Sequence, residues 1–189
     1  VPSSGEISID GVSYNAISIS ALQRSIGYVT QESAVFNGNL TENLTLWETQ
    51  PDIQRVENIL EQLELQNIGE GSKASTFGNH LIGGDGAQLS GGERQRIGIA
   101  RELYRNPAFM ILDEATSALD SKLEQKIDEL LESQRGNKTF LIIAHRLSTI
   151  RNADLIYVLD KGKLVESGSF DELVAANNLF ARMIKMQEF

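Results

Sequence analysis

The sequence predicts an α/β fold built around a mostly parallel sheet. After Pro107, strand-like and helix-like stretches alternate along the chain, which is typical of parallel sheets whose strands are joined by helices. Residues 109–112 and 139–144 are two apolar runs without alternation, as in strands that are buried on both faces. Polar residues follow each run directly, so we expect functional side chains at the carboxyl ends of these strands.

The beginning of the chain is expected to form three short elements. Residues 6–10 alternate as a strand that turns at Gly11. Residues 17–23 have the pattern of a short helix, and residues 26–31 form a strand that ends in Gln31.

The next part, from about residue 33 to Pro107, is expected to be mainly helical. Pro51 and Asp52 open one helix. The apolar positions of that helix recur at helical spacing: Ile53, Val56, Leu60 and Leu63. Residues 65–88 are rich in glycine without periodicity, so we expect a loop. A second helix begins after Ser90 and ends before Pro107.

The last third of the chain continues the alternation. Ser121 and Glu124 have the spacing of a capping box that opens a helix, and Gly136 suits its end. The positions expected on its buried face are Leu123, Ile127, Leu130 and Leu131. Residues 155–165 form a hairpin with its turn at 160–162, and residues 171–176 and 179–186 form the closing helices.

The composition limits the classes of function. A chain of 189 residues with 41% hydrophobic and 23% charged residues is typical of a soluble globular domain with a real core. The absence of cysteine excludes disulfides and thiolate metal sites. A net charge of −9 argues against a nucleic-acid-binding surface. The nearest approach to a basic cluster lies along one helix: Arg94, Arg96, Arg101 and Arg105.

The stretch LSGGERQR at residues 89–96 is the most informative motif. Ser90 and Glu93 form a capping box at the start of a helix, and the two glycines leave its first N–H groups open to an anion. A capped helix without a ligand would explain the box alone. The whole octapeptide resembles the LSGGQ signature of ABC ATPases, with Glu in place of Gln. The resemblance implies that Ser90, Gly91, Gly92 and Glu93 contact ATP that is held by a partner domain.

Residues 109–114 form a second motif, four apolar residues followed by Asp113 and Glu114. Two surface carboxylates that cap a strand would explain the pair alone. In this position after the signature the run resembles a Walker B motif. The resemblance implies that Asp113 holds Mg2+ through water and that Glu114 polarises the attacking water as the general base.

Three further sites in the sequence follow the order of motifs in the same family. Gln31 resembles the glutamine of the Q-loop, which touches Mg2+ and water. Residues 117–120 resemble the D-loop, which places Asp120 at the seam between two domains. His145 ends the strand at 139–144 and resembles the switch histidine that contacts the γ-phosphate. Because this chemistry gathers around one phosphate, we expect the strand ending in Asp113 between the Gln31 and His145 strands.

The phosphate-binding loop of the family, G-x-x-x-x-G-K-[ST], is missing from the sequence. Gly162 and Lys163 form a Gly-Lys pair, but Leu164 follows it and the pattern is that of a hairpin turn. The family places the P-loop just before a segment like residues 5–11, so we expect a piece cut just after the P-loop helix. We expect such a piece, without Walker A, to be inactive as an ATPase on its own.

The resemblance implies a P-loop ATPase-type fold without its N-terminal strands and P-loop helix. Residues 1–189 would be a partial ABC ATPase domain. Residues 33–107 would form a helical subdomain that carries the signature, and residues 1–32 and 108–189 would form the α/β core.

The exporter-type match implies a module that binds and hydrolyses ATP with Mg2+ to power export across a membrane. Two such domains, identical or different, would pair and attach to a transmembrane domain at the cytoplasmic face, with no role for nucleic acid. Two alternatives remain. A non-hydrolysing regulatory module is disfavoured for the whole protein by Glu114 and His145, although the missing P-loop favours it for this piece. A non-transport ABC ATPase is disfavoured by the acidic charge. The transported substrate is not encoded in this sequence.

Overall fold

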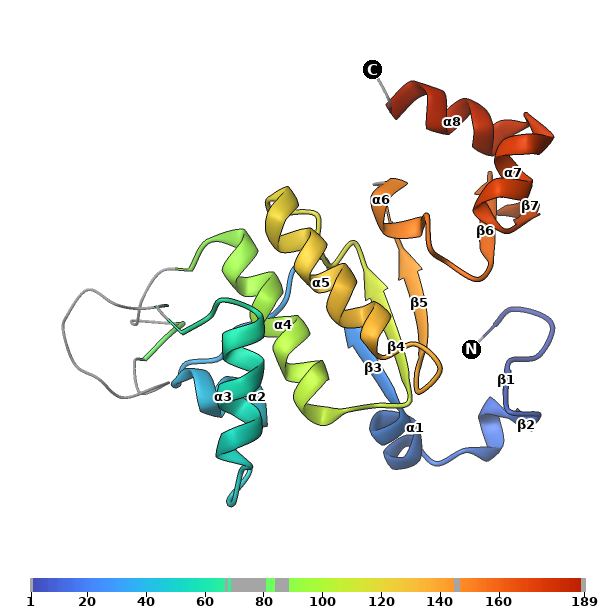
Figure 1. The fold of residues 1–189 in the computed structure, drawn as a ribbon. Helices are drawn as coiled ribbons and strands as arrows, with labels where there is room; N and C mark the ends of the chain where they lie inside the picture. Colours follow the sequence, from blue (N-terminus) through green and yellow to red (C-terminus); the bar gives the residue numbers. More distant parts are fainter. Residues whose placement is uncertain (1, 67, 69–80, 84–88, 145–146, 188–189) are drawn as a thin grey trace. The chain divides into compact units, whose positions relative to one another are not determined.

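The computed structural model describes residues 2–66, 68, 81–83, 89–144 and 147–187, and it divides the chain into two compact units, Val1–Leu141 and Ile142–Phe189 (Figure 1). The strands of the first unit and the junction are β1 (Ser8–Ile9), β2 (Val12–Ser13), β3 (Ile26–Val29), β4 (Phe109–Asp113) and β5 (Thr139–Ile143). The helices up to that strand are α1 (Ile19–Ser25), α2 (Leu40–Thr45), α3 (Ile53–Gln62), α4 (Gly91–Arg105) and α5 (Ser121–Ser133). The later elements are α6 (Leu147–Ile150), β6 (Ile156–Asp160), β7 (Lys163–Gly168), α7 (Phe170–Ala176) and α8 (Leu179–Gln187).

The first strands are shorter than predicted, and the first helix is shifted by two residues. The strand expected over residues 6–10 is a two-residue strand in a small antiparallel hairpin with β2. Asp10 and Gly11, with φ of 50° and 77°, make its turn. The expected helix begins later, because Ser18 caps it by accepting from the Ala21 N–H at 3.3 Å.

A three-stranded sheet in the order β3-β4-β5 organises the first unit. The central place of β4 confirms the predicted order of the strands. β3 and β4 run parallel, with Gly27 opposite Met110 and Val29 opposite Leu112. Because side chains alternate along a strand, these four residues share one face of the sheet.

The burial of β4 differs from the prediction that both of its faces are buried. Met110 and Leu112 are 0% and 4% exposed, whereas Phe109, Ile111 and Asp113 are only half-buried. Val29, on the face of Met110 and Leu112, lies near Gly98 of α4, so the well-buried face is the one that α4 covers. Among the described residues, the opposite face is therefore the more accessible one.

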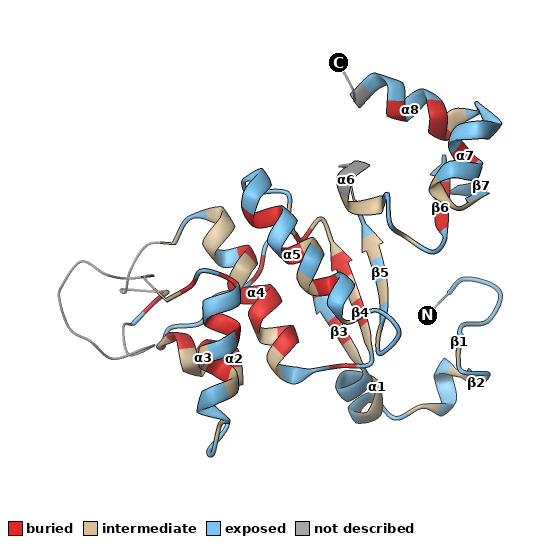
Figure 2. Ribbon diagram, in the orientation of Figure 1, coloured by how far each residue is buried: buried red, intermediate tan, exposed pale blue. Residues whose placement is uncertain are grey.

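α4 is the central helix of the first unit. It packs against α2, α3 and β3, and buried residues run along its length (Figure 2). The prediction of its cap is confirmed, since Ser90 accepts from the Glu93 N–H and Glu93 accepts from the Ser90 N–H. Asn106, in the left-handed region at φ 57°, ends the helix just before Pro107.

A glycine brings α4 very close to the segment after β3. A Cβ on Gly98 would lie 2.0 Å from Oγ and 2.6 Å from Cβ of Ser33. Atoms of a larger side chain would overlap at these distances, so this helical glycine sets the closest approach between the two segments.

The arginines of α4 bind main-chain carbonyls of the same chain. Arg96 donates to the carbonyls of Leu63 and Glu64 at 3.0 and 2.7 Å, at the end of α3. Arg101 donates to the carbonyls of Ala34 and Asn43 at 3.0 and 2.8 Å. These charged side chains therefore fasten α4 to its neighbours and satisfy backbone groups.

α3 and α5 follow their predicted patterns with three differences. Ile53 is 50% exposed, although the rest of its predicted apolar face is buried, and Leu130 of α5 is only half-buried. The predicted capping box of Ser121 and Glu124 is wrong. Asp120 caps α5 instead, because its carboxylate reaches two backbone N–H groups at once.

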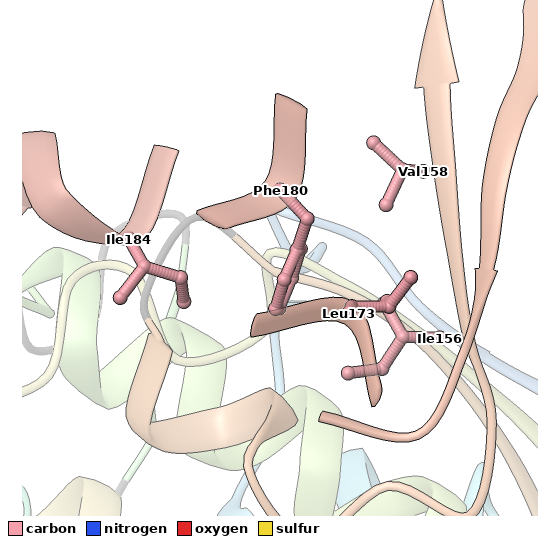
Figure 3. Packing of buried hydrophobic residues seen from close by; sticks show 5 residues of the cluster. All are labelled: Ile156, Val158, Leu173, Phe180 and Ile184. Carbon is pink, nitrogen blue, oxygen red and sulfur yellow. The ribbon is translucent and has the colours of Figure 1, made fainter. Parts of the chain in front are cut away.

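The second unit is built on the predicted hairpin. β6 and β7 pair antiparallel, and α7 and α8 pack beside them. Its core is a cluster of five buried residues, shown in Figure 3: Ile156, Val158, Leu173, Phe180 and Ile184. The edge-to-face contact of Phe170 and Phe180, with ring centroids 5.6 Å apart, adds to this core.

Candidate functional site

The carboxyl end of β4 carries the two predicted acidic residues. Asp113 is the last residue of the strand, and Glu114 follows it with a left-handed φ of 51°. This conformation is strained for a residue other than glycine, and such strain gathers at functional positions. The turn changes the direction of the chain directly after the strand.

Asp113 receives a hydrogen bond from the neighbouring strand. The Tyr28 hydroxyl donates to its Oδ2 at 2.9 Å. This hydrogen bond and the charge of the Asp113 carboxylate raise the pKa of Tyr28 above its usual value, so the hydroxyl stays protonated. Tyr28 lies on the more accessible face of the sheet, and it orients the carboxylate there.

Gln31 and Glu114 are brought together through the buried side chain of Gln95. Its Nε2 lies 3.1 Å from the Gln31 carbonyl oxygen and 3.3 Å from that of Glu114. The same nitrogen lies 3.0 Å from the Ser117 hydroxyl, and Oε1 accepts from the Ala118 N–H at 2.9 Å. One side chain of α4 thus joins the ends of two adjacent strands.

The signature residues form the N-terminal end of α4. Ser90 is exposed, and Gly91, Gly92 and Glu93 are half-buried. Glu93 Oε2 accepts from both the N–H and the hydroxyl of Ser90, each at 2.7 Å. The carboxylate of Glu93 therefore already lies at the positive end of the helix, beside the place expected for a phosphate.

Gly92 also has a packing role. A Cβ there would lie 3.0 Å from the Ala118 carbonyl oxygen, whereas a Cβ on Gly91 would lie 3.6 Å from the Ala118 Cβ. The first distance is tight and the second is an ordinary contact. The start of α4 therefore lies directly against the segment that leads to Asp120.

Asp120 has a clear structural role in this chain. Its Oδ1 accepts from the N–H groups of Lys122 and Leu123, both at 3.1 Å. This cap fixes the end of the 117–120 segment at the start of α5.

The structure thus gathers most of the predicted site residues in the first unit. Gln31 and Glu114 meet through Gln95, and Asp113 directly precedes Glu114. His145 lies outside the described residues. The sequence analysis missed two residues, Tyr28 and Gln95. Gln95 stands inside the signature octapeptide, but its burial is visible only in the structure.

The carboxylate at the end of β4 suits a Mg2+ ion that takes its other ligands from outside the chain. Among the described residues, no three His, Cys, Asp or Glu side chains are grouped to hold a metal by themselves. Mg2+ usually takes one or two carboxylates and completes its shell with water and phosphate oxygens. The single oriented carboxylate of Asp113 matches that requirement.

The comparisons with known proteins agree with the motifs. The family model described as "ABC transporter" matches residues 1–117. The chain is similar to the solved structure of a bacterial Atm1-family ABC exporter with ATP bound, with a TM-score of 0.91 and 34% identity over 100% of this chain and 33% of that one.

Curated relatives carry names of exporters. The chain is 42% identical over 187 residues to an ATP-dependent lipid A-core flippase of Burkholderia orbicola, which covers 98% of this chain and 31% of the relative. It is 43% identical over 186 residues to the β-(1→2)glucan export protein NdvA of Rhodopseudomonas palustris, with 98% and 31% covered. The chain therefore spans about a third of the length of these relatives.

Proposed function

This chain belongs to the ABC transporter family, and from that premise we propose that it is part of the ATP-hydrolysing module of a membrane exporter. The observation that carries the proposal is the meeting of Gln31, Glu114 and the start of α4 around Gln95. The likeness to exporters over nearly the whole chain supports export as the process that hydrolysis drives.

In this proposal the end of β4 performs the chemistry on ATP. Bound Mg2+ would neutralise charge on the phosphates. Asp113 would hold that ion through water, with its carboxylate oriented by Tyr28. Glu114 would accept a proton from the attacking water, and Gln31 would help to orient the ion and the water. His145 remains a proposed contact of the γ-phosphate.

The start of α4 would act on the ATP of a second domain. Its first N–H groups and the helix dipole favour a phosphate. Ser90, Gly91, Gly92 and Glu93 would make this contact, and Asp120 would lie at the seam between the two domains. The packing of Gly92 against Ala118 supports one rigid surface made of both segments.

The partners in this proposal are a second ABC ATPase domain, identical or different, and a transmembrane domain. The chain would then lie at the cytoplasmic face of a membrane. Within the part of the chain that the structure describes, no helix is both long and apolar enough to cross a bilayer.

The test replaces the proposed base in the assembled transporter. Glu114→Gln keeps the shape of the side chain and removes the proton acceptor, so ATP binding should persist while turnover falls about 100- to 10,000-fold. Glu132→Gln is the matched control, because Glu132 is an exposed residue of α5 that forms a salt bridge with Arg135. Equilibrium nucleotide binding and phosphate release measure the two effects. Turnover within a few-fold of the unmodified protein would show that Glu114 is not the base.

A further inference from the structure

The side chain of Gln95 is one of the few buried polar groups of the described chain, at 2% exposed. It lies in the second turn of α4, just after the capped start. Its amide nitrogen contacts three acceptors and its oxygen accepts one N–H. An amide has two N–H protons, so at least one of them is shared between two acceptors.

The partners of Gln95 come from three separate segments. Gln31 follows β3, Glu114 follows β4, and Ser117 and Ala118 precede the cap of α5. Three of the four contacts are to main-chain atoms. Gln95 therefore determines where the backbone of these segments lies, whatever side chains they carry.

Only a group with both a donor and an acceptor satisfies this environment. An apolar side chain of the same length would fill the space, but it would leave the Gln31 carbonyl and the Ala118 N–H without this partner. A carboxylate would keep the acceptor for Ala118 and place an oxygen against the carbonyls of Gln31 and Glu114. Burial makes each such loss costly.

We propose that Gln95 is a positioning residue for hydrolysis, which holds Glu114 in its left-handed turn and sets the 117–118 segment against the start of α4. Its importance for turnover rests on the proposed function. Its effect on the geometry of the turn does not depend on the proposed function. Turnover and turn geometry are therefore tested in separate experiments.

The first experiment measures hydrogen exchange of single amides in the 189-residue chain by NMR. Gln95→Met removes all four contacts, so the Ala118 N–H should exchange about 10-fold faster. Gln95→Glu keeps an acceptor oxygen, so the protection of Ala118 should stay within about 3-fold of the unmodified chain. Unchanged protection of Ala118 in Gln95→Met would overturn the proposal.

The second experiment measures ATP turnover in the assembled transporter. A base displaced by about 1 Å loses on the order of 10- to 100-fold in rate, so kcat should fall by this factor in both Gln95 variants. KM for ATP should change less than about 3-fold, because Gln95 is not among the residues that are proposed to contact the nucleotide. If wild-type protein shows no ATP turnover, the proposed function fails, and the exchange result alone decides whether Gln95 positions the turn.

Asn43 offers a matched control for loss of a buried amide. It is 0% exposed, and its side chain bonds the main chain of Phe36 and Asn39 rather than the site. Asn43→Leu should destabilise the fold and leave kcat per folded molecule unchanged. An equal fall in kcat for Asn43→Leu and Gln95→Met would overturn the proposal, because the effect would then be general loss of packing. Should Gln95→Met fail to fold, Gln95→Glu carries the same comparison.

Discussion

The close approach of α4 to the segment after β3 predicts that Gly98→Ala destabilises the fold. The same change should become stabilising when the neighbouring Ser33 is replaced by glycine. Alanine is favoured over glycine inside a helix by about 1 kcal/mol. At Gly98, however, the new Cβ would lie 2.6 Å from the Ser33 Cβ, about 1 Å inside an ordinary contact. Overpacking costs about 1–3 kcal/mol, and the approach of 2.0 Å to the Ser33 Oγ places this site at the upper end of that range, at about 2–3 kcal/mol. We therefore expect Gly98→Ala to lower the free energy of unfolding by about 1–2 kcal/mol.

The compensating change is Ser33→Gly, which removes both overlapping atoms. The next neighbour of the new Cβ is then Val29 Cγ1 at 3.6 Å, an ordinary contact. In the Ser33→Gly background the helix preference should dominate, so Gly98→Ala should stabilise by up to about 1 kcal/mol. The two residues should thus show a coupling free energy of about 2–3 kcal/mol.

Urea unfolding of the four proteins in this cycle measures the coupling. With a slope of about 1–3 kcal/mol per molar urea, a loss of about 1–2 kcal/mol in Gly98→Ala should lower the midpoint by roughly 0.3–2 M. In the Ser33→Gly background the same change should raise the midpoint. A midpoint that rises in both backgrounds, or falls equally in both, would refute the reasoning from steric overlap.

The remaining predictions concern the dimer seam and the pH dependence of stability. Ser90→Arg or Gly91→Asp should leave ATP binding intact but prevent ATP-dependent dimers in a Glu114→Gln background, because the new side chain occupies the space above the helix N-terminus. Size-exclusion chromatography with ATP reports this, and undiminished dimers would contradict the assignment. Burial, with a smaller contribution from the Glu124 carboxylate, raises the pKa of Asp128 to about 6. The folded state therefore loses stability as pH rises from about 4 to about 6, and Asp128→Asn should remove that loss. Because Asp128 is only half-buried, we expect Asp128→Asn to raise the free energy of unfolding by about 1 kcal/mol at pH 7.5, and this gain should shrink toward pH 4. Thermal melting of the unmodified protein and of Asp128→Asn at pH 7.5 and pH 4 measures this gain. An equal gain at the two pH values would contradict the prediction.

The features that could be predicted from the sequence are mainly those that depend on residues adjacent in the chain. The cap of α4, the turn at Gly11 and the hairpin of β6 and β7 each follow from a few adjacent residues. The central place of β4 also followed, because the motifs require three strand ends around one phosphate. The division at residues 33 and 107 stays a prediction, as do the roles of the site residues.

What the sequence did not predict depends on contacts between distant residues. Tyr28 and Asp113 are 85 positions apart, and Gln95 and Gln31 are 64 apart, so no local pattern pairs them. The error at α5 has a different cause. Asp120 and Ser121 are both good caps in sequence, and only the three-dimensional path of the chain decides that the carboxylate reaches the N–H groups.

The fastening of α4 by its arginines has a mechanical consequence. Its 15 residues make a rod about 22 Å long. Arg96 and Arg101 tie this rod to the end of α3, to α2 and to the segment before α2, so these contacts couple its position to theirs. A tilt of about 5° around the C-terminal end would carry the N-terminal amides of α4 roughly 2 Å, more than half the length of a hydrogen bond. A small rotation imposed far from the signature would therefore be enough to make or break the proposed contact with a phosphate.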